Sequence, residues 1–405
     1  MALAAGTLSS IGVPPAAAGS TTTTIVSELA GVSCATVTFC VAVGQQIVST
    51  AASSSQNALI ETYNGSTWIG LSTPAVTTGD GSALLGVSCP SATFCMATGY
   101  DSSSEPLVLT WDGSSWSTLL SGPTSPLAVP EPMAFGEGAE LSGVSCVSSA
   151  YCVAVGRTGA STVPNHGLLA AYSNGQWTTA TTAVTKPVAF TAVSCASTAF
   201  CLAVGITSVG NPYTSGFGNI PNLNAATSPG NVQGAAVAEV WDGTSWSIAF
   251  SNQSIVGPVP PLWGVSCPEI GFCAAVGDPN PDSTSSVSEG SEVTYTTGGG
   301  WVCTPAGPVD SATVPLGVSC VSGTTTGQTV GATSTLTVSN PGSFGAYLYG
   351  TFVSTYNGTS WSSGQWAVPS GSSNNQFSGV NSSRRSRHPV AQISGSHACA
   401  WEMQG

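Results

Sequence analysis

The sequence carries very little charge. Charged residues make up 6% of its 405 residues, against about 25% in an average soluble domain, so few surface ion pairs can stabilise the fold. Five Lys and Arg face 18 Asp and Glu, which gives a net charge of −13. Arg157 and Lys186 are the basic residues that precede position 384. Because nucleic acids and anionic membranes are bound by clustered cations, both classes of partner are excluded.

Long apolar runs are also missing. No stretch of about 18 uninterrupted apolar residues exists, so we expect no membrane insertion. The chain is nevertheless 41% apolar, which suffices for a large buried core and excludes wholesale disorder. Residues 1–27 are small and apolar without a positive start, so we interpret them as a truncated secretion signal or an Ala-rich leader.

A repeated unit dominates the rest of the chain. Its first half reads GVSCATVTFCVAVG from Gly31, and the Val of this VSC motif recurs at positions 32, 87, 144, 193, 265 and 318. Its second half is a hairpin with an Asn-Gly or Asp-Gly turn followed by Trp, such as TWDGSSW from Thr110. Each unit therefore predicts four short strands.

Units of this length with four strands each are typical of a β-propeller. A right-handed β-solenoid is the competing architecture, but its coils are shorter and lack such hairpin turns. We predict an all-β propeller over residues 28–375 with six complete four-stranded repeats and a degenerate seventh. Residues 376–405 would hold the start of that seventh repeat and a basic tail.

The second strand of each unit alternates bulky and small residues. Phe39, Val41 and Val43 share one face, and Cys40 and Ala42 share the other. The bulky face is expected to pack on the small-residue face of the next blade. The Trp after each hairpin turn recurs in every unit, so we interpret it as a blade-packing residue: Trp68, Trp116, Trp177, Trp246, Trp301 and Trp361.

On these motifs the chain resembles secreted bacterial β-propeller repeat proteins. Its blades are similar to kelch repeats and to the Asp-box hairpins of sialidase-like propellers, and the similarity covers roughly residues 28 to 366. What this resemblance implies is architecture, not a particular activity.

Thirteen cysteines indicate an oxidising compartment, and we predict a secreted or cell-surface protein. Five pairs have the same spacing at the first hairpin of a unit, where the two residues lie opposite each other, so we predict five local disulfides: Cys34 with Cys40, Cys89 with Cys95, Cys146 with Cys152, Cys195 with Cys201, and Cys267 with Cys273. A zinc site is disfavoured because the chain has three histidines and no Cys-x-x-Cys. A bridge between Cys303 and Cys320 is a further hypothesis.

The C-terminal segment departs from the pattern. Phe377 to Val380 begin a seventh unit, but Asn381 and Ser382 replace Ser and Cys, and three arginines follow. Two interpretations remain open: a reading-frame slip or truncation that removed most of a seventh blade, or a disordered basic tail.

Ligand-binding residues are expected on the variable loops of one face. The loop from Ile206 to Gly234 carries Tyr213, Phe217 and Asn219, and aromatic rings beside amides suit sugar recognition. A loop whose aromatics pin it to the blade is the alternative. Trp263 is a further candidate at the channel mouth or a blade interface.

Three carboxylates, Glu131, Glu137 and Glu140, lie on another long connection. They could bind calcium, although solvated acids on a loop are the interpretation we favour. No other cofactor is expected.

Most enzyme classes are disfavoured because the catalytic residues they require are missing from the sequence. The arginine triad of a sialidase, the histidines of a copper oxidase and a GxSxG motif are all missing. A glycan-active hydrolase or lyase remains an alternative, with Glu131, Glu137, Glu239 and Asp278 as its candidate carboxylates near the central channel.

The sequence therefore predicts a non-catalytic, monomeric propeller that binds an extracellular glycan or protein. A purely structural surface or adhesion module is the third interpretation.

Overall fold

The computed structural model describes residues 23–50, 52–71, 73, 81–121, 127, 137–160, 166–185, 188–208, 234–251, 262–277, 291–298, 300–305, 312–321, 323–337 and 346–366. These residues form six four-stranded antiparallel sheets, each built from consecutive strands. The predicted repeat is therefore one sheet, here called a blade. Among the described residues there is no helix that could span a membrane.

Blades 1 to 3 come from the first half of the chain. Blade 1 contains β1 (Thr24–Thr36), β2 (Phe39–Ser49), β3 (Ser54–Tyr63) and β4 (Trp68–Leu71). Blade 2 contains β5 (Ala83–Ser91), β6 (Phe94–Tyr100), β7 (Pro106–Trp111) and β8 (Trp116–Leu120). Blade 3 contains β9 (Glu137–Ser148), β10 (Tyr151–Ala160), β11 (His166–Ser173) and β12 (Gln176–Ala180).

Blades 4 to 6 repeat the same order. Blade 4 contains β13 (Val188–Ser197), β14 (Phe200–Ser208), β15 (Gly234–Trp241) and β16 (Trp246–Ser251). Blade 5 contains β17 (Leu262–Glu269), β18 (Phe272–Gly277), β19 (Ser291–Thr296) and β20 (Gly300–Pro305). Blade 6 contains β21 (Ala312–Cys320), β22 (Thr326–Thr337), β23 (Ala346–Asn357) and β24 (Trp361–Trp366).

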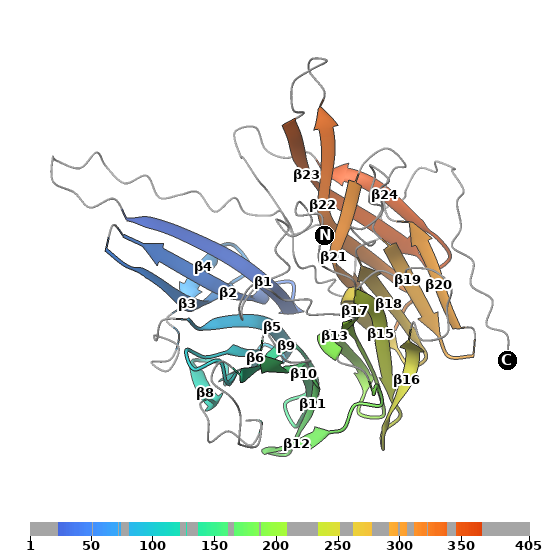
Figure 1. Ribbon diagram of the computed structural model, residues 1–405, viewed down its shortest axis with the longest axis horizontal. Helices are drawn as coiled ribbons and strands as arrows, with labels where there is room; N and C mark the ends of the chain where they lie inside the picture. The colour runs from blue at the N-terminus through green and yellow to red at the C-terminus, as the bar shows by residue number, and fades with distance from the viewer. Residues whose placement is uncertain are drawn as a thin grey trace.

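The first strand of each blade lies on the inside of the propeller. These inner strands contact one another in sequence, from β1 against β5 to β17 against β21. The blades follow an arc around a common centre, with blades 1 and 6 at its two ends (Figure 1). The predicted all-β propeller architecture is confirmed.

The core lies between neighbouring blades, as the alternation of the second strand predicts. Val41 and Val43 of blade 1 pack in one buried cluster with Cys95 and Ala97 of blade 2. The middle of the second strand is buried on both faces because a blade covers each side; in β6, for example, Cys95 to Tyr100 are all buried. This packing of a bulky face on a small-residue face stabilises the propeller.

The recurring Trp has the packing role that its repetition indicated. In each blade it lies against an aromatic residue at the end of the third strand, with ring centroids 4.9 to 5.8 Å apart and planes tilted by 40 to 51°. Some pairs also stack on the preceding blade: the ring centroid of Trp111 in blade 2 lies 6.3 Å from that of Phe39 in blade 1. Tilted aromatic pairs of this kind add about 0.5–1.5 kcal/mol beyond the area they bury.

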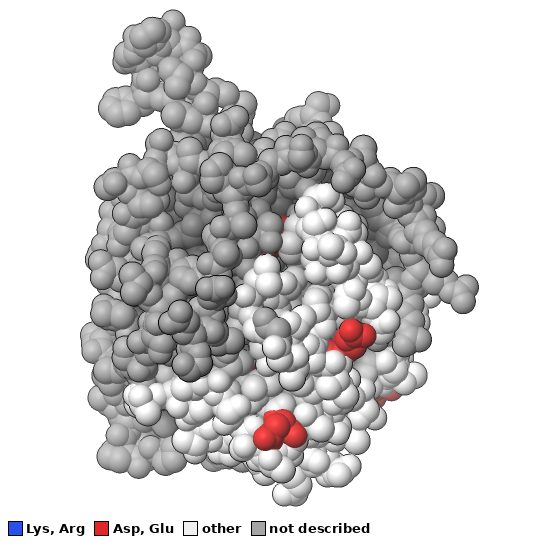
Figure 2. All heavy atoms as spheres, turned by 90° about the vertical axis from the view of Figure 1, so that its right-hand side faces the viewer, with Lys and Arg blue, Asp and Glu red and all other residues white. Residues whose placement is uncertain are grey.

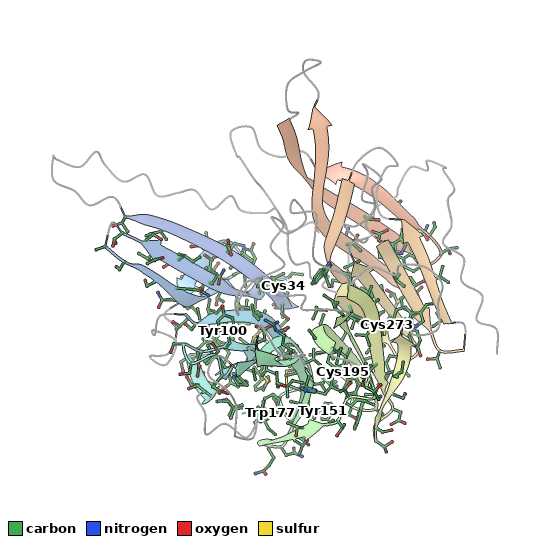
Figure 3. The ribbon with its side chains drawn as sticks, viewed as in Figure 1. Cys34, Tyr100, Tyr151, Trp177, Cys195 and Cys273 are labelled. Carbon is green, nitrogen blue, oxygen red and sulfur yellow. A yellow bond between two sulfur atoms is a disulfide. The ribbon has the colours of Figure 1, made fainter. Side chains whose placement is uncertain are left out.

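The five local disulfides are present as predicted. Each joins the first and second strands of blades 1 to 5, with Cα atoms 3.9 to 4.1 Å apart. Figure 3 labels one cysteine from each of three of these bridges: Cys34 on β1, Cys195 on β13 and Cys273 on β18. Closing such a short loop contributes roughly 2–3 kcal/mol in the chain-entropy model.

The predicted bridge between Cys303 and Cys320 is wrong. Cys320 is a free thiol that is 7% exposed. The residue opposite it across the hairpin is Gly327, which occupies the position of Cys40 in blade 1. Cys303 lies on β20 of blade 5, opposite Val293. Blade 6 therefore has the first cysteine of this hairpin, and a glycine stands in place of the second.

Candidate functional site

A groove of about 370 Å³ lies between the outer halves of blades 3 and 4. Blade 3 contributes residues of β10, β11 and β12, and blade 4 contributes its last hairpin. Its lining combines three aromatic rings with five hydroxyl residues and a few small aliphatic ones: Tyr151, Trp241, Trp246, Thr178, Thr179, Thr181, Thr244, Ser245, Val153, Ala170, Ala171 and Ala180. No Lys, Arg, Asp or Glu is among these residues.

Tyr151 distinguishes this interface from its neighbours. It is the first residue of β10, where the second strands of blades 1, 2, 4 and 5 begin with Phe. The ring, labelled in Figure 3, is half-buried on the face of blade 3 that packs against blade 4. Burial raises the pKa of the Tyr151 hydroxyl. The neutral phenol therefore gives the groove a polar group at an otherwise apolar position.

Trp241 and Trp246 form the opposite wall. Their ring centroids are 5.7 Å apart and their planes are tilted by 44°. The indole N–H of Trp241 donates to the carbonyl of Thr198 at 3.1 Å. The indole N–H of Trp246 meets no acceptor in the part of the chain that the structure describes, and Trp246 is half-buried at the groove.

At the next interface the equivalent indole N–H has an acceptor, whereas those of Trp116, Trp177 and Trp361 have none among the described residues. Between blades 4 and 5, the indole N–H of Trp301 donates to the carbonyl of Ala249 at 3.1 Å. Ala249 lies at a register shift between β15 and β16, opposite Ala238 and Glu239. A bulge of this kind turns a carbonyl out of the ladder. β11 and β12 pair without a shift, but β7 and β8 have the same shift at Leu119 and the Trp177 N–H still has no partner among the described residues. The indole N–H of Trp246 thus lacks the acceptor that Trp301 has, as do those of Trp116, Trp177 and Trp361, and Trp246 is the one of these four that lines the groove.

The hydroxyl side of the groove faces solvent. Thr178, Thr179 and Thr181 are exposed, and the Thr178 hydroxyl makes one long hydrogen bond, 3.4 Å, to the carbonyl of Ala171. Thr244 and Ser245 belong to the turn around Asp242, whose carboxylate accepts from both backbone N–H groups. Hydrogen bonds from the Thr244 hydroxyl and these N–H groups lower the pKa of Asp242 to about 2. That charge is therefore satisfied within the turn.

None of the described residues that the sequence analysis expected at a site lines this groove. Tyr213, Phe217, Asn219, Glu131 and Asp278 lie outside the described residues. Glu137 begins β9, and its backbone alone is described. Trp263 is a half-buried residue of β17 at a register shift, and it does not line the groove. The one sequence signal for the groove was the replacement of Phe by Tyr151.

The proposed grouping of carboxylates for calcium needs correction at Glu140. This residue is buried, and its Oε1 accepts from the Nε of Arg157 at 2.8 Å. The described part of the chain holds no group of three His, Cys, Asp or Glu side chains that could bind a metal. Glu140 thus serves a buried ion pair inside blade 3, between β9 and β10.

Glu239 is equally unsuited to the catalytic role considered for it. It is fully buried. It accepts hydrogen bonds from the Thr182 hydroxyl and from the backbone N–H groups of Ala183 and Val184, both at 3.1 Å. These donors belong to the connection between blades 3 and 4. The carboxylate therefore fixes the chain path that leads from the groove into β13, which is a structural role.

Surface charge around the propeller is sparse and acidic. On the face turned toward the viewer in Figure 2, the described surface shows a few Asp and Glu and no Lys or Arg. An anionic ligand would find no cationic partner on the described part of this face.

Comparison with known proteins gives no family for the chain. No family model matches, and no curated protein matches, so the kelch-like and Asp-box-like resemblances stay predictions. Among solved structures, the six-bladed, fucose-recognising lectin of Aleuria aurantia is 12% identical, with a TM-score of 0.43 over 85% of this chain and 97% of its own.

Two other solved structures are similarly distant. The lectin SapL1, solved with α-methyl fucoside, is 12% identical, with a TM-score of 0.40 over 85% of this chain and 97% of its own. YCF48 bound to a D1 peptide is 12% identical, with a TM-score of 0.36 over 76% of this chain and 93% of its own. At such identities and TM-scores, these likenesses carry no conclusion about the ligand of this chain.

Proposed function

We propose that this protein is a non-catalytic propeller that binds an uncharged glycan in the groove between blades 3 and 4. The observation that carries the proposal is the free indole N–H of Trp246, held beside two further aromatic rings and a row of exposed hydroxyls. An aromatic face packs on the apolar face of a sugar ring, while indole and hydroxyl groups bond its hydroxyls.

The size and charge of the groove limit which ligands can bind. Its volume of about 370 Å³ is near the lower end of the roughly 300–1,000 Å³ typical of small-molecule sites. One or two sugar rings would fill it. Because no basic side chain lines it, uronic and sialic acids are expected to bind more weakly than neutral sugars.

We further infer an extracellular or cell-surface location. Five disulfides occur within the blades, and such bridges form and persist in oxidising compartments. A glycan ligand is in keeping with that location. A protein ligand on the variable loops and a purely structural role are the competing outcomes of the test below.

The test is a glycan array followed by titration calorimetry on any glycan retained. Trp246→Phe removes the free N–H and keeps the ring, so we expect roughly tenfold weaker binding. Trp301→Phe is the matched control, because it removes the same N–H one interface away and should leave the affinity unchanged. Retention of no glycan, or equal affinity of the Trp246→Phe variant and the parent, would overturn the proposal.

A further inference from the structure

A row of hydrogen bonds joins the inner strands of neighbouring blades. In each, the Ser hydroxyl of one VSC motif accepts from the backbone N–H of the Cys in the next blade, at 2.8 to 2.9 Å. The donors and acceptors are Cys89 to Ser33, Cys146 to Ser88, Cys195 to Ser145, Cys267 to Ser194, and Cys320 to Ser266. This serine ladder fixes the register of each blade against the one before it.

Blade 1 lacks the partner that this ladder requires. The N–H of Cys34 occupies the equivalent position on β1, and no Ser hydroxyl among the described residues accepts from it. The inner strands contact one another from β1 to β21, but β21 and β1 do not share the contacts that join the other neighbours. The described blades therefore leave one face of β1 without a neighbouring inner strand (Figure 1).

The sequence after β24 contains a segment with the pattern of an inner strand. Thirty-nine residues follow Trp366, and Phe377-Ser378-Gly379-Val380 parallels Phe190-Thr191-Ala192-Val193 at the start of a VSC motif. The positions of Ser and Cys in that motif are then taken by Asn381 and Ser382. An Asn side-chain carbonyl can accept the same hydrogen bond as a Ser hydroxyl.

We propose that residues 377–382 of this chain are the occupant of the open face of β1, as the inner strand of a unit between β21 and β1. In this register the Asn381 side chain accepts from the Cys34 N–H. The amide of Ser382 meets the hydroxyl of Ser319, the next Ser of the ladder on β21.

Burial and charge favour this occupant. Val380 corresponds to Val144, Val193 and Val318, which are 7 to 8% exposed between blades, so seating it removes an apolar side chain from water. Arg384, Arg385 and Arg387 follow directly, in a chain whose net charge is −13. Their charge is complementary to that of the blades on which the segment would lie.

The first test is hydrogen exchange of the full chain. Val380→Asp places a charge at the buried position and should raise the exchange rate of the peptide that contains Cys34 by about 100-fold. Val390→Asp is the matched control, since it makes the same change outside the motif and should leave exchange unchanged. Equal exchange in the two variants and the parent would overturn the proposal.

The second test does not depend on the stability of a variant. A photoreactive benzoylphenylalanine at position 380 should crosslink within one chain to peptides of β1 or β21, and the same group at position 390 should not. Crosslinks between two chains would assign the open face to a second copy instead. The absence of any crosslink to β1 or β21 would overturn the proposal as well.

Discussion

The inner and outer halves of the propeller follow different rules. Each inner half repeats the same contacts: a serine accepts from the next blade at 2.8 to 2.9 Å, and a disulfide closes the hairpin in blades 1 to 5. The outer halves differ at each interface. Glu239 and the groove lie between blades 3 and 4, Trp301 bonds between blades 4 and 5, and Glu292 lies between blades 5 and 6.

This difference has a physical cause. The inner strands converge, so their side chains must fit a fixed spacing, whereas the outer strands diverge and leave room for other contacts. A ligand site can therefore arise at one outer interface while the inner contacts keep the blades in register.

The largest effect is expected from an outer contact, at Glu239. Glu239→Ala leaves three donors of the connection at residues 182–184 unpaired and should lower the free energy of unfolding by about 4 kcal/mol. Denaturant unfolding measures it. Glu61 holds the equivalent strand position and has no hydrogen-bond donor in the described part of the chain, so Glu61→Ala should cost less than about 0.5 kcal/mol. Similar losses for the two variants would contradict the assigned role.

A second outer contact should make stability depend on pH. Burial raises the pKa of Glu292 to about 7, opposed by hydrogen bonds from Thr329 and Ser354. The folded state thus holds the proton more tightly than the unfolded chain, whose Glu titrates near 4.5. Stability from this group is present below pH 4.5 and is lost as the pH rises to about 7, by at most about 3 kcal/mol.

Unfolding curves of the parent and of Glu292→Gln between pH 4 and 8 check this prediction. The glutamine does not titrate and keeps one acceptor for the same donors, so its curve should lack the decline assigned to Glu292. Parallel curves for the two proteins would exclude Glu292 as the titrating group.

An inner contact can be added where the repeat lost it. A Cβ built on Gly327 would lie 2.6 Å from the Sγ of Cys320, as the missing half of a disulfide would. Gly327→Cys should form a sixth bridge and stabilise the protein by about 2 kcal/mol under oxidising conditions. Mass spectrometry after alkylation detects the bridge, and a reducing agent provides the control. A free thiol at position 327 would show that blade 6 departs from the geometry of the other hairpins.

The smallest change in stability is expected for the two tryptophans. Trp301→Phe removes a hydrogen bond to Ala249 and should lower the free energy of unfolding by about 1 kcal/mol. Trp246→Phe removes an N–H without a described partner, so its stability should change by less than about 0.5 kcal/mol. Thermal unfolding of both variants measures these changes. A larger loss of stability for Trp246→Phe than for Trp301→Phe would mean that the Trp246 N–H already has an acceptor within the fold.

The sequence by itself determined the strands, the number of described blades and the five disulfides. These features follow from short-range spacing: alternation fixes the faces of a strand, an Asn-Gly or Asp-Gly turn fixes a hairpin, and two cysteines across one hairpin must lie close together. It did not determine that Cys320 is a free thiol. That outcome follows from the strand register, which places Gly327 where the other hairpins have their second Cys.

The groove was decided by the tertiary structure. Trp246 and Trp301 hold the same position in their repeats, and nothing in the sequence tells one indole N–H from the other. Trp301 finds an acceptor in Ala249, at a register shift of β16, but the same shift at Leu119 of β8 gives Trp177 none among the described residues. Glu239 likewise gained its role from a connection more than 50 residues away. Such contacts depend on how two blades meet, which spacing within one repeat does not encode.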